Sequence, residues 1–311
     1  MTDKKRQSTT TYTFGAGKRE RHDASLFYNR FTPPAVRDSQ DVCPAAQRVG
    51  CDEIYCGDIR DFEDVVSKNS VALVVTSPPY FAGKEYEIEK PDTPSTRDYD
   101  QYLKMLTEVF SACVDLLEPG GRMAVNVANL GRKPYRSLST DVISILQNDL
   151  SLLLRGEIIW KKSKGAAGNC AWGSFQKASN PVLRDITERI VIASKDRFDR
   201  AISAKKRSQL GLPYLSTIGK EEFMEFTLDV WEFSSERATV VGHPAPFPVE
   251  LPRRLIELYT YENDIVLDPF MGSGSTAVAA IQTGRHFIGF DTEPKYVETA
   301  KKRIADRTEA N

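Results

Sequence analysis

Residues 264–276 read Asp-Ile-Val-Leu-Asp-Pro-Phe-Met-Gly-Ser-Gly-Ser-Thr, and this stretch decides the fold. An apolar run comes first, and Gly272 and Gly274 then precede a predicted helix. A strand, a glycine turn and a helix in this order let the backbone approach a ligand closely, and the exposed amides of the new helix favour an anionic group. The spacing Gly-x-Gly-x-x-Ala is weak evidence by itself, because it would serve a dinucleotide equally well. Asp291, which follows the next predicted strand, is placed to bind two ribose hydroxyls in either case.

A second string, Thr-Ser-Pro-Pro-Tyr at residues 76–80, ends a continuous apolar run over residues 71–75 that is typical of a central parallel strand. The string suits chemistry on the exocyclic amino group of a base, which becomes nucleophilic only when hydrogen-bond acceptors engage its N–H groups. The Ser77 hydroxyl and the Pro78 carbonyl can accept these bonds, and two prolines fix the backbone so that the carbonyl points outward. Tyr80 offers an aromatic face for a base swung out of the duplex. For this string alone, a rigid turn with a core tyrosine stays open as the alternative.

In this order, the two strings resemble those of the beta-group amino DNA methyltransferases, whose circular permutation puts the catalytic motif before the cofactor loop. The resemblance covers roughly residues 53–305 and implies direct in-line methyl transfer from S-adenosyl-L-methionine (AdoMet). It implies that Asp268 orients the methionine amino group and that Asp58 lies near the adenine ring, although a plain turn aspartate is an equal interpretation of Asp58. The residues implied for catalysis are Ser77, Pro78, Pro79 and Tyr80. The residues implied for cofactor binding are Asp268, Pro269, Phe270, Gly272, Ser273, Gly274, Ser275, Thr276, Asp291 and Asp58.

The identity of the base is a finer question. In this family a serine at position 77 usually accompanies methylation of cytosine N4, whereas an aspartate usually accompanies methylation of adenine N6. The string His-Pro-Ala-Pro-Phe-Pro at residues 243–248 also resembles the serine-type members and is expected to form the far wall of the cofactor pocket, with His243 as a structural residue. We therefore expect a site-specific cytosine-N4 methyltransferase, with adenine N6 as the alternative. Cytosine C5 methylation needs a thiolate in a Pro-Cys context, and no cysteine here follows a proline.

Two interpretations from other classes are disfavoured. Methylation of a protein glutamine is one, because its enzymes carry Asn-Pro-Pro-Tyr after the cofactor loop. A non-catalytic DNA-binding module is the other, because both strings look intact. The resemblance implies double-stranded DNA as the substrate and a restriction–modification system with a cognate restriction endonuclease as the setting. A monomer and a homodimer both stay open.

The alternation of apolar strands with helices indicates a mostly parallel, doubly wound α/β sheet of the Rossmann-like AdoMet-dependent methyltransferase type. The chain ends one helix after Asp291, whereas a nucleotide-binding half-sheet needs one more strand, which residues 53–56 can supply. The permutation is thus predicted by strand counting as well as by motif order. We expect an N-terminal arm over 1–50, a catalytic half over 51–195, a small target-recognition insertion over 196–228 and an AdoMet-binding half over 229–311. Apolar periodicity predicts helices over 99–117, 138–153, 249–259, 275–282 and 296–304, and strands over 123–127, 157–160, 189–193, 265–267 and 286–290.

The net charge of −1 gives no sign of a nucleic-acid partner, but the distribution of charge does. Residues 155–207 hold 13 lysines and arginines against 5 acidic residues, an excess expected of a surface that contacts phosphates. Chance clustering on a solvated surface is the alternative. The predicted DNA contacts are Lys161, Lys162, Lys164, Lys205, Lys206 and Arg207.

The five cysteines form no Cys-x-x-Cys pair, which argues against a disulfide framework and against a metal site. No apolar stretch is long enough to span a bilayer, and the N-terminus lacks the apolar core of a signal peptide. We therefore expect a cytoplasmic protein without a bound metal.

Overall fold

The computed structural model describes residues 35–44, 47–62, 64–79, 99–130, 135–162, 173–183, 185–235 and 248–308. Its strands are β1 (Glu53–Cys56), β2 (Val71–Thr76), β3 (Leu117–Val127), β4 (Leu153–Lys162), β5 (Thr187–Ser194), β6 (Val230–Phe233), β7 (Ile265–Asp268) and β8 (His286–Asp291). Its helices are η3 (Ile59–Asp61), α4 (Tyr99–Leu116), α5 (Leu138–Ser144), the π-helical η4 (Ile145–Asp149), α6 (Ala204–Gln209), α7 (Lys220–Phe226), α9 (Glu250–Tyr259), α10 (Ser275–Gln282) and α11 (Pro294–Thr308).

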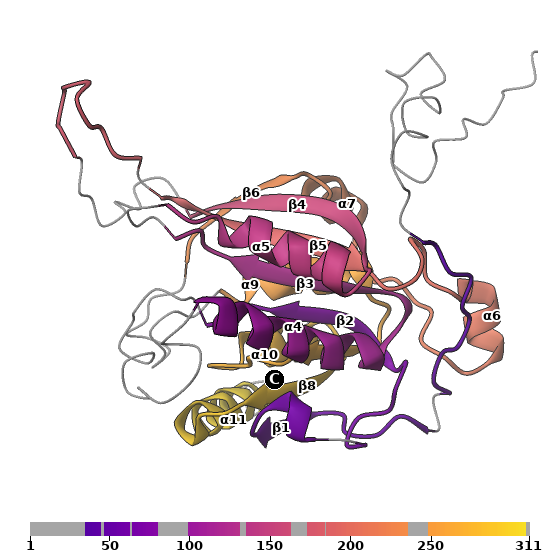
Figure 1. The fold of residues 1–311 in the computed structure, drawn as a ribbon. Helices are drawn as coiled ribbons and strands as arrows, with labels where there is room; N and C mark the ends of the chain where they lie inside the picture. The colour runs from indigo at the N-terminus through magenta and orange to yellow at the C-terminus, as the bar shows by residue number, and fades with distance from the viewer. Residues whose placement is uncertain are drawn as a thin grey trace, which may run out of the picture.

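The strands in the described part of the chain form one sheet in the order β1-β8-β7-β2-β3-β5-β4-β6. Neighbouring strands pair in parallel except around β5, which runs antiparallel to both β3 and β4. Helices α4 and α5 cover one face of the sheet, and α9 to α11 cover the other (Figure 1). The predicted fold class, a mostly parallel doubly wound α/β sheet, is confirmed.

β1 is the outer strand of the sheet and pairs with β8, which lies far along the chain (Figure 1). Glu53 pairs with Ile288, and Cys56 pairs with Asp291. The strand that the C-terminal half lacks is therefore supplied from the N-terminal half, as predicted. The late strand β7 lies between β8 and the early strand β2, so the central strands come from opposite ends of the sequence.

Two apolar clusters fill the space between the sheet and its helix layers. Tyr102 and Phe110 of α4 belong to the first cluster, and Leu255 of α9 belongs to the second. Successive side chains of a strand point to opposite faces, and accordingly Val74 enters the first cluster while Val75 enters the second. All six residues of β2 are buried. A strand that is apolar on both faces cannot shift its register without losing this burial, so the point at which β2 ends is well defined.

Several elements differ from the sequence predictions, and helices α6 and α7 were not predicted. β3 begins at Leu117 rather than at residue 123, because Gly120 continues the strand at φ 80° and its amide donates to Lys195 O. A Cβ atom at Gly120 would lie 1.9 Å from Asp199 O, so glycine is required for this close approach. The helix predicted over 138–153 ends in the π turn at Asp149, and β4 already begins at Leu153. β6 was not predicted.

The segment 196–228, predicted to be a target-recognition insertion, begins with a buried ionic cluster. Arg200 and Arg207 pair with Glu118 at 2.6 and 2.9 Å, and with Asp264 at 2.9 and 3.3 Å. Arg48 lies within 4.0 Å of both carboxylates. Burial opposes the charge on Arg200, but Asp264 and Glu118 outweigh it and raise the pKa of that guanidinium. Glu118 and Asp264 stand at the amino ends of β3 and β7, so the cluster fixes this segment to the amino edge of the sheet.

Candidate active site

The two strings singled out in the sequence meet at the carboxyl edge of the sheet. β2 and β7 are parallel neighbours in which Val74 pairs with Leu267, so both strands end at the same edge. Ser77 follows the end of β2, and the glycine turn follows Asp268 at the end of β7. The Thr76 hydroxyl donates to Asp268 Oδ1 at 2.7 Å and joins the two strand ends directly.

Asp268 is fully buried, and its carboxylate accepts three hydrogen bonds from the protein. Besides Thr76, the Thr276 hydroxyl donates to Oδ2 at 2.6 Å and the Phe270 amide donates to Oδ1 at 3.1 Å. Burial raises the pKa of Asp268 to about 6 in spite of these bonds, and the nearby Asp291 adds to the rise. A buried carboxylate held in this way favours a cationic partner, since neutralisation of its charge offsets part of the cost of burial.

The turn after Asp268 has the backbone geometry of a ligand cradle. Gly272 and Gly274 have φ angles of 52° and 84°, a region that favours glycine. A Cβ atom at Gly274 would lie 3.0 Å from the Cβ atom of Ala300 in α11, so only glycine lets the turn pack this closely. Gly274 is also the N-terminal cap of α10, whose free amides attract an anionic group. Ser273, Ser275 and Thr276 are buried in the same turn.

Asp291 and Asp58 lie at the same edge, at the ends of β8 and β1. Asp291 Oδ2 accepts from the Gly272 amide at 2.8 Å, and its Oδ1 accepts from the Glu293 amide at 2.9 Å. These bonds place its carboxylate directly against the glycine turn. The Gly57 amide donates to Asp291 O at 2.9 Å, which brings the β1 turn that carries Asp58 beside it. The turn and its flanking acids fit AdoMet, because helix amides meet the cofactor's carboxylate while carboxylates meet its amino and ribose groups.

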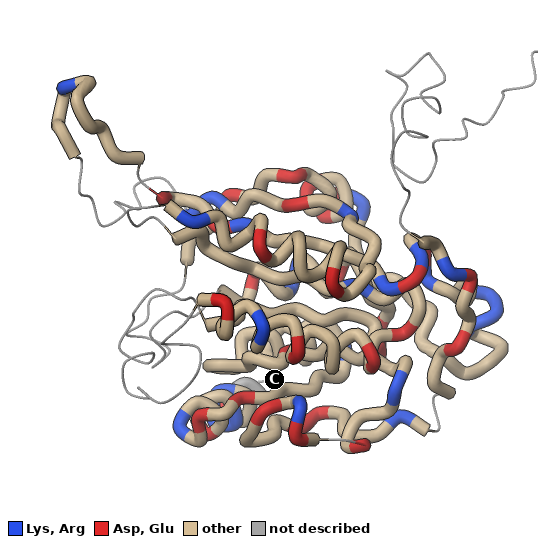
Figure 2. Tube along the Cα trace, viewed as in Figure 1, with Lys and Arg blue, Asp and Glu red and all other residues tan. Residues whose placement is uncertain are grey.

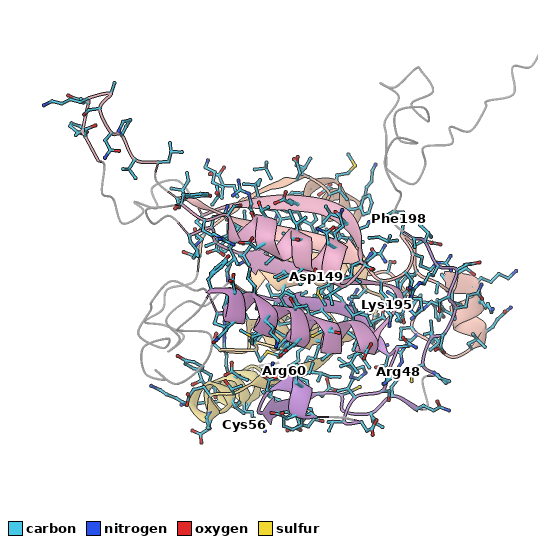
Figure 3. The ribbon with its side chains drawn as sticks, viewed as in Figure 1. Arg48, Cys56, Arg60, Asp149, Lys195 and Phe198 are labelled. Atoms are coloured by element: carbon cyan, nitrogen blue, oxygen red, sulfur yellow. The ribbon has the colours of Figure 1, made fainter. Side chains whose placement is uncertain are left out.

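Asp58 is held by Arg60 in the turn after β1. Its carboxylate accepts from the Arg60 amide at 3.0 Å and from the guanidinium at 2.9 and 2.7 Å. Partial burial raises the pKa of Asp58, but the hydrogen bonds from Arg60 outweigh it and hold the pKa below its ordinary value. Arg60 also bonds Glu108 of α4 at 2.5 Å, and Figure 3 shows Arg60 between β1 and α4. Asp58 therefore stays ionised and fixed in direction, whether or not a ligand contacts it.

The catalytic string forms a corner that α4 supports. Pro78 is buried, whereas Ser77 and Pro79 are partly exposed. The hydroxyl of Tyr102, a residue buried in α4, donates to Pro79 O at 2.8 Å and so holds the corner in one direction. Tyr80 lies outside the described residues, and so does the 236–247 stretch that contains His243.

The family model N6_N4_Mtase, described as DNA methylase, matches residues 71–302. The chain belongs to this DNA methylase family. The type II methyltransferase M.BglI of Bacillus subtilis is similar to this methylase, with 29% identity over 305 residues that cover 80% of this chain and 84% of M.BglI. M.MjaI of Methanocaldococcus jannaschii, also a type II methyltransferase, is 28% identical over 282 residues, covering 81% of this chain and 90% of M.MjaI.

Solved structures support the same assignment. TTHA0409 of Thermus thermophilus, assigned as a DNA modification methylase and solved in complex with AdoMet, matches the methylase with a TM-score of 0.63 and 28% identity. That match covers 82% of this chain and 93% of TTHA0409. The cytosine-N4-specific PvuII DNA methyltransferase matches with a TM-score of 0.60, covering 82% of this chain and 87% of that enzyme. At 22% identity, the PvuII match shows a shared fold.

Arg207 is not a phosphate contact, which corrects the sequence prediction. Its side chain is fully buried, and its guanidinium is bound by Glu118, Asp264 and the carbonyl of Pro213. Lys205 and Lys206 are exposed on α6, on the side of the methylase where Figure 3 labels Arg48 and Lys195. This is the amino edge of the sheet, so neither lysine lies beside the catalytic corner.

Two of the remaining predicted contacts lie at the carboxyl end of β4. Lys161 Nζ pairs with Glu232 of β6 at 3.2 Å and is partly exposed. Lys162 pairs with the buried Glu188 of β5, and its Nζ lies 5.4 Å from the centre of the Trp160 ring. Lys164 lies outside the described residues. Both described lysines are thus held by carboxylates, and Lys161 is the better candidate for exchanging its partner for a phosphate, because Glu232 is exposed whereas Glu188 is buried.

Much of the basic excess in residues 155–207 is used inside the fold. Arg200 and Arg207 neutralise buried carboxylates, and Arg197 pairs with Asp38 at 2.6 Å. Lys195 donates to Leu117 O at 2.7 Å, and burial lowers its pKa. Figure 2 shows acidic residues interspersed with the basic ones along this part of the tube. A count along the sequence could not separate these buried charges from surface charges.

The described residues contain no group of His, Cys, Asp and Glu that could hold a metal ion. Among the helices described, none is both long and apolar enough to cross a membrane.

Proposed function

We propose that this methylase transfers a methyl group from AdoMet to the exocyclic N4 amino group of a cytosine flipped out of double-stranded DNA. The observation that carries the proposal is the hydrogen bond between Thr76 and Asp268, which puts the catalytic corner and the glycine turn side by side. Membership of the DNA methylase family and the similarity to TTHA0409, solved with AdoMet, support the same substrate and donor.

Different residues of the pocket bind different parts of AdoMet. The amides in the first turn of α10 receive the cofactor's carboxylate, Asp268 receives its amino group, and Asp291 receives its ribose hydroxyls. Asp58, held by Arg60, faces the adenine side of the pocket. When bound, AdoMet supplies an electrophilic sulfonium methyl group. Because this group needs no activation, the protein contributes mainly by positioning the acceptor nitrogen in line with it.

The corner at residues 77–79 positions that nitrogen. Tyr102 holds the Pro79 carbonyl in one direction, and the Ser77 hydroxyl and the Pro78 carbonyl accept hydrogen bonds from the amino group of the bound base. When both N–H groups of the base donate to these acceptors, the nitrogen lone pair is less delocalised into the ring, and the amino group becomes nucleophilic. Tyr80 stacks on the flipped base and holds it in the plane that these acceptors require. Lys161 and Lys164 contact the flanking phosphates and hold the register.

The choice of cytosine rests on Ser77, which has a hydroxyl where adenine-N6 enzymes of the family usually carry a carboxylate. The test is to express the methylase in a host without endogenous methylation, digest the DNA to nucleosides and identify the product by mass spectrometry. The proposal expects N4-methylcytosine. A product of N6-methyladenine would keep the fold and the donor but reassign the base. Unmodified DNA, with no heat of AdoMet binding in calorimetry, would favour a non-catalytic DNA-binding module.

Residue substitutions test the division of tasks. Ser77→Ala should slow methyl transfer by about 100-fold, comparable to removal of one preorganised hydrogen-bonding group from an active site, and should leave AdoMet affinity unchanged. Tyr80→Ala should behave similarly, whereas Asp291→Ala should chiefly weaken AdoMet binding. An equal loss of AdoMet affinity in all three variants would contradict these assignments.

We further propose that the methylase works in the cytoplasm as the modification half of a restriction–modification system, since several similar proteins are type II methyltransferases. Sequencing of host DNA with detection of modified bases would reveal the recognition sequence. A single modified motif, protected from cleavage by an endonuclease of the same specificity, is the expected result. Methylation without any sequence preference would contradict this setting.

A further inference from the structure

A row of polar side chains crosses four adjacent strands next to the catalytic serine. Val75, Ala124, Ile190 and Trp160, on β2, β3, β5 and β4, all belong to the same apolar cluster and so share one face of the sheet. Side chains two positions away on a strand share that face. This rule places Asn126, Glu188 and Lys162 on that face at the carboxyl edge. Ser77 directly follows β2 and precedes Pro78, which favours extended backbone at Ser77, so we infer that its side chain continues the row.

The register of β2 and β3 brings the position after β2 toward Asn126. Thr76, the last residue of β2, pairs with Val125, so we infer that Ser77, which continues in extended backbone before Pro78, lies beside Asn126. Asn126 is almost fully buried, with 1% of its surface exposed, although it stands at the edge of a pocket that must admit a polar base. Because Asn126 is placed beside the Ser77 hydroxyl, the orientation of the Asn126 amide matters for the proposed chemistry.

The orientation of the Asn126 amide is set by Glu188. Asn126 Nδ2 donates to Glu188 Oε2 at 2.5 Å, so the amide nitrogen faces β5. Lys162 pairs with the other oxygen of Glu188, which is also buried, with 5% of its surface exposed. A buried carboxylate is tolerated when a charged partner and hydrogen bonds compensate for its desolvation, and the row supplies both. The two polar atoms of an amide diverge, so we infer that the buried Asn126 Oδ1 faces away from β5, toward β2 and Ser77.

We propose that Asn126, held by Glu188 and Lys162, is a positioning residue for Ser77. A serine hydroxyl has one proton and two lone pairs, and it accepts from a base amino group only while its proton points elsewhere. Asn126 Oδ1 takes that proton as a hydrogen bond when the base is bound, and a Ser77 lone pair then faces the base N–H group. This inference rests on the proposed function, because it acts through the role assigned there to Ser77.

Exchanging the donor and acceptor roles of Asn126 and Glu188 tests whether this row positions Ser77. The single variant Asn126→Asp places two carboxylates next to each other and removes the amide that donates to Glu188. It should slow single-turnover methyl transfer by about tenfold or more, because small misplacements of reacting groups are costly. The double variant Asn126→Asp with Glu188→Gln restores a donor and an acceptor in reversed order, keeps the charge of the row and again leaves an oxygen toward Ser77. We expect the double variant to recover to within about threefold of the wild-type rate. A purely structural role predicts that the rate follows the unfolding temperature, so a slow Asn126→Asp that unfolds at the wild-type temperature and keeps its AdoMet affinity supports the positioning role.

The measurements use the full chain, tritiated AdoMet at saturation and unmethylated genomic DNA, with AdoMet affinity by calorimetry and thermal unfolding as checks of folding. Glu157→Gln is the matched control, because Glu157 pairs with Arg189 at 3.9 Å across the same two strands, with both side chains 36% exposed. This control should keep the wild-type rate. Equal rates for Asn126→Asp and the double variant, fast or slow, would overturn the inference. Ser77→Ala measured in parallel separates the two proposals. If Ser77→Ala is slow and Asn126→Asp is fast, only the positioning role of Asn126 is contradicted. If Ser77→Ala is fast, the role of Ser77 is contradicted as well.

Discussion

Thr76 and Asp268, which are 192 residues apart in the sequence, share a buried hydrogen bond of 2.7 Å. Thr76 is the last residue of β2 and Asp268 the last of β7, so the bond joins the final residues of two adjacent parallel strands. It connects the residue before Ser77 with the carboxylate that precedes the glycine turn. The two halves of the pocket are therefore held in one fixed relationship by the sheet itself.

Replacing Thr76 with valine tests this connection, because valine keeps the β-branched shape and removes only the hydroxyl. The buried carboxylate would lose one of its donors, at a cost of about 1–2 kcal/mol in the free energy of unfolding. AdoMet affinity should fall as well, since Asp268 would turn away from its bound position. Calorimetry and urea unfolding measure the two effects. Thr299→Val, at an exposed hydroxyl that bonds only Lys295 O at 2.8 Å among the described contacts, is the control.

The raised pKa of Asp268 predicts a dependence on pH. Its pKa in the fold is about 6 against an ordinary value of 3.8, because burial favours the protonated form. Protonation of Asp268 therefore contributes stability that is fully present below pH 3.8 and is lost as the pH rises through about 6. AdoMet binding has the opposite sign, since the cofactor's amino group favours the ionised carboxylate. Its affinity should rise as the pH increases through about 6. Asp268→Asn should bind weakly with no such step, and a step that survives in this variant would assign it to another group.

The Tyr102 hydroxyl should matter for transfer and not for cofactor binding. Tyr102→Phe keeps the buried ring in α4 and removes the bond to Pro79 O. The corner would become free to rotate, and the rate at saturating substrates should fall by about tenfold, while AdoMet affinity stays at the wild-type value. Tyr135→Phe, at a tyrosine that is 57% exposed, provides the control. A wild-type rate for Tyr102→Phe would show that prolines 78 and 79 hold the corner without help.

Arg207 should act on stability and not on DNA binding. Arg207→Met removes a buried cation and leaves Glu118 and Asp264 partly uncompensated, at a cost of about 3–5 kcal/mol in the free energy of unfolding. The salt dependence of DNA binding by the folded variant should be unchanged, because no phosphate contact is lost. Lys205→Ala, on the exposed side of α6, should alter neither property. A smaller salt slope for Arg207→Met, with stability intact, would restore the phosphate contact that the sequence suggested.

The sequence allowed the fold class and the meeting of the two strings to be predicted, because both depend on strong local patterns. The apolar run before Ser77 is typical of a buried strand, and glycines between a strand and a helix are typical of a loop that binds a nucleotide or AdoMet. The outer strand at residues 53–56 was predicted by counting the strands that a nucleotide-binding half-sheet needs. These features could be predicted without knowing which side chains contact one another in the folded protein.

The predictions that failed concern charges and chain direction, which depend on distant partners. Arg207 follows two lysines that are exposed, and nothing local marks it as the one that turns inward to Glu118. Gly120 falls between the helix predicted over 99–117 and the strand predicted over 123–127, but its positive φ serves a strand that passes close to Asp199. Asn126 and Glu188 could not be paired from sequence, since β3 and β5 are antiparallel neighbours only in the finished sheet.

The side-by-side placement of β2 and β7 also has a consequence for the newly made chain. β2 leaves the ribosome early, and its parallel partner β7 is synthesised almost two hundred residues later. Through that interval one side of a largely apolar strand has no neighbour, which is a state prone to aggregation or in need of a chaperone. The pocket proposed here therefore cannot form before β7 has been synthesised, because β7 carries Asp268 and leads into the glycine turn.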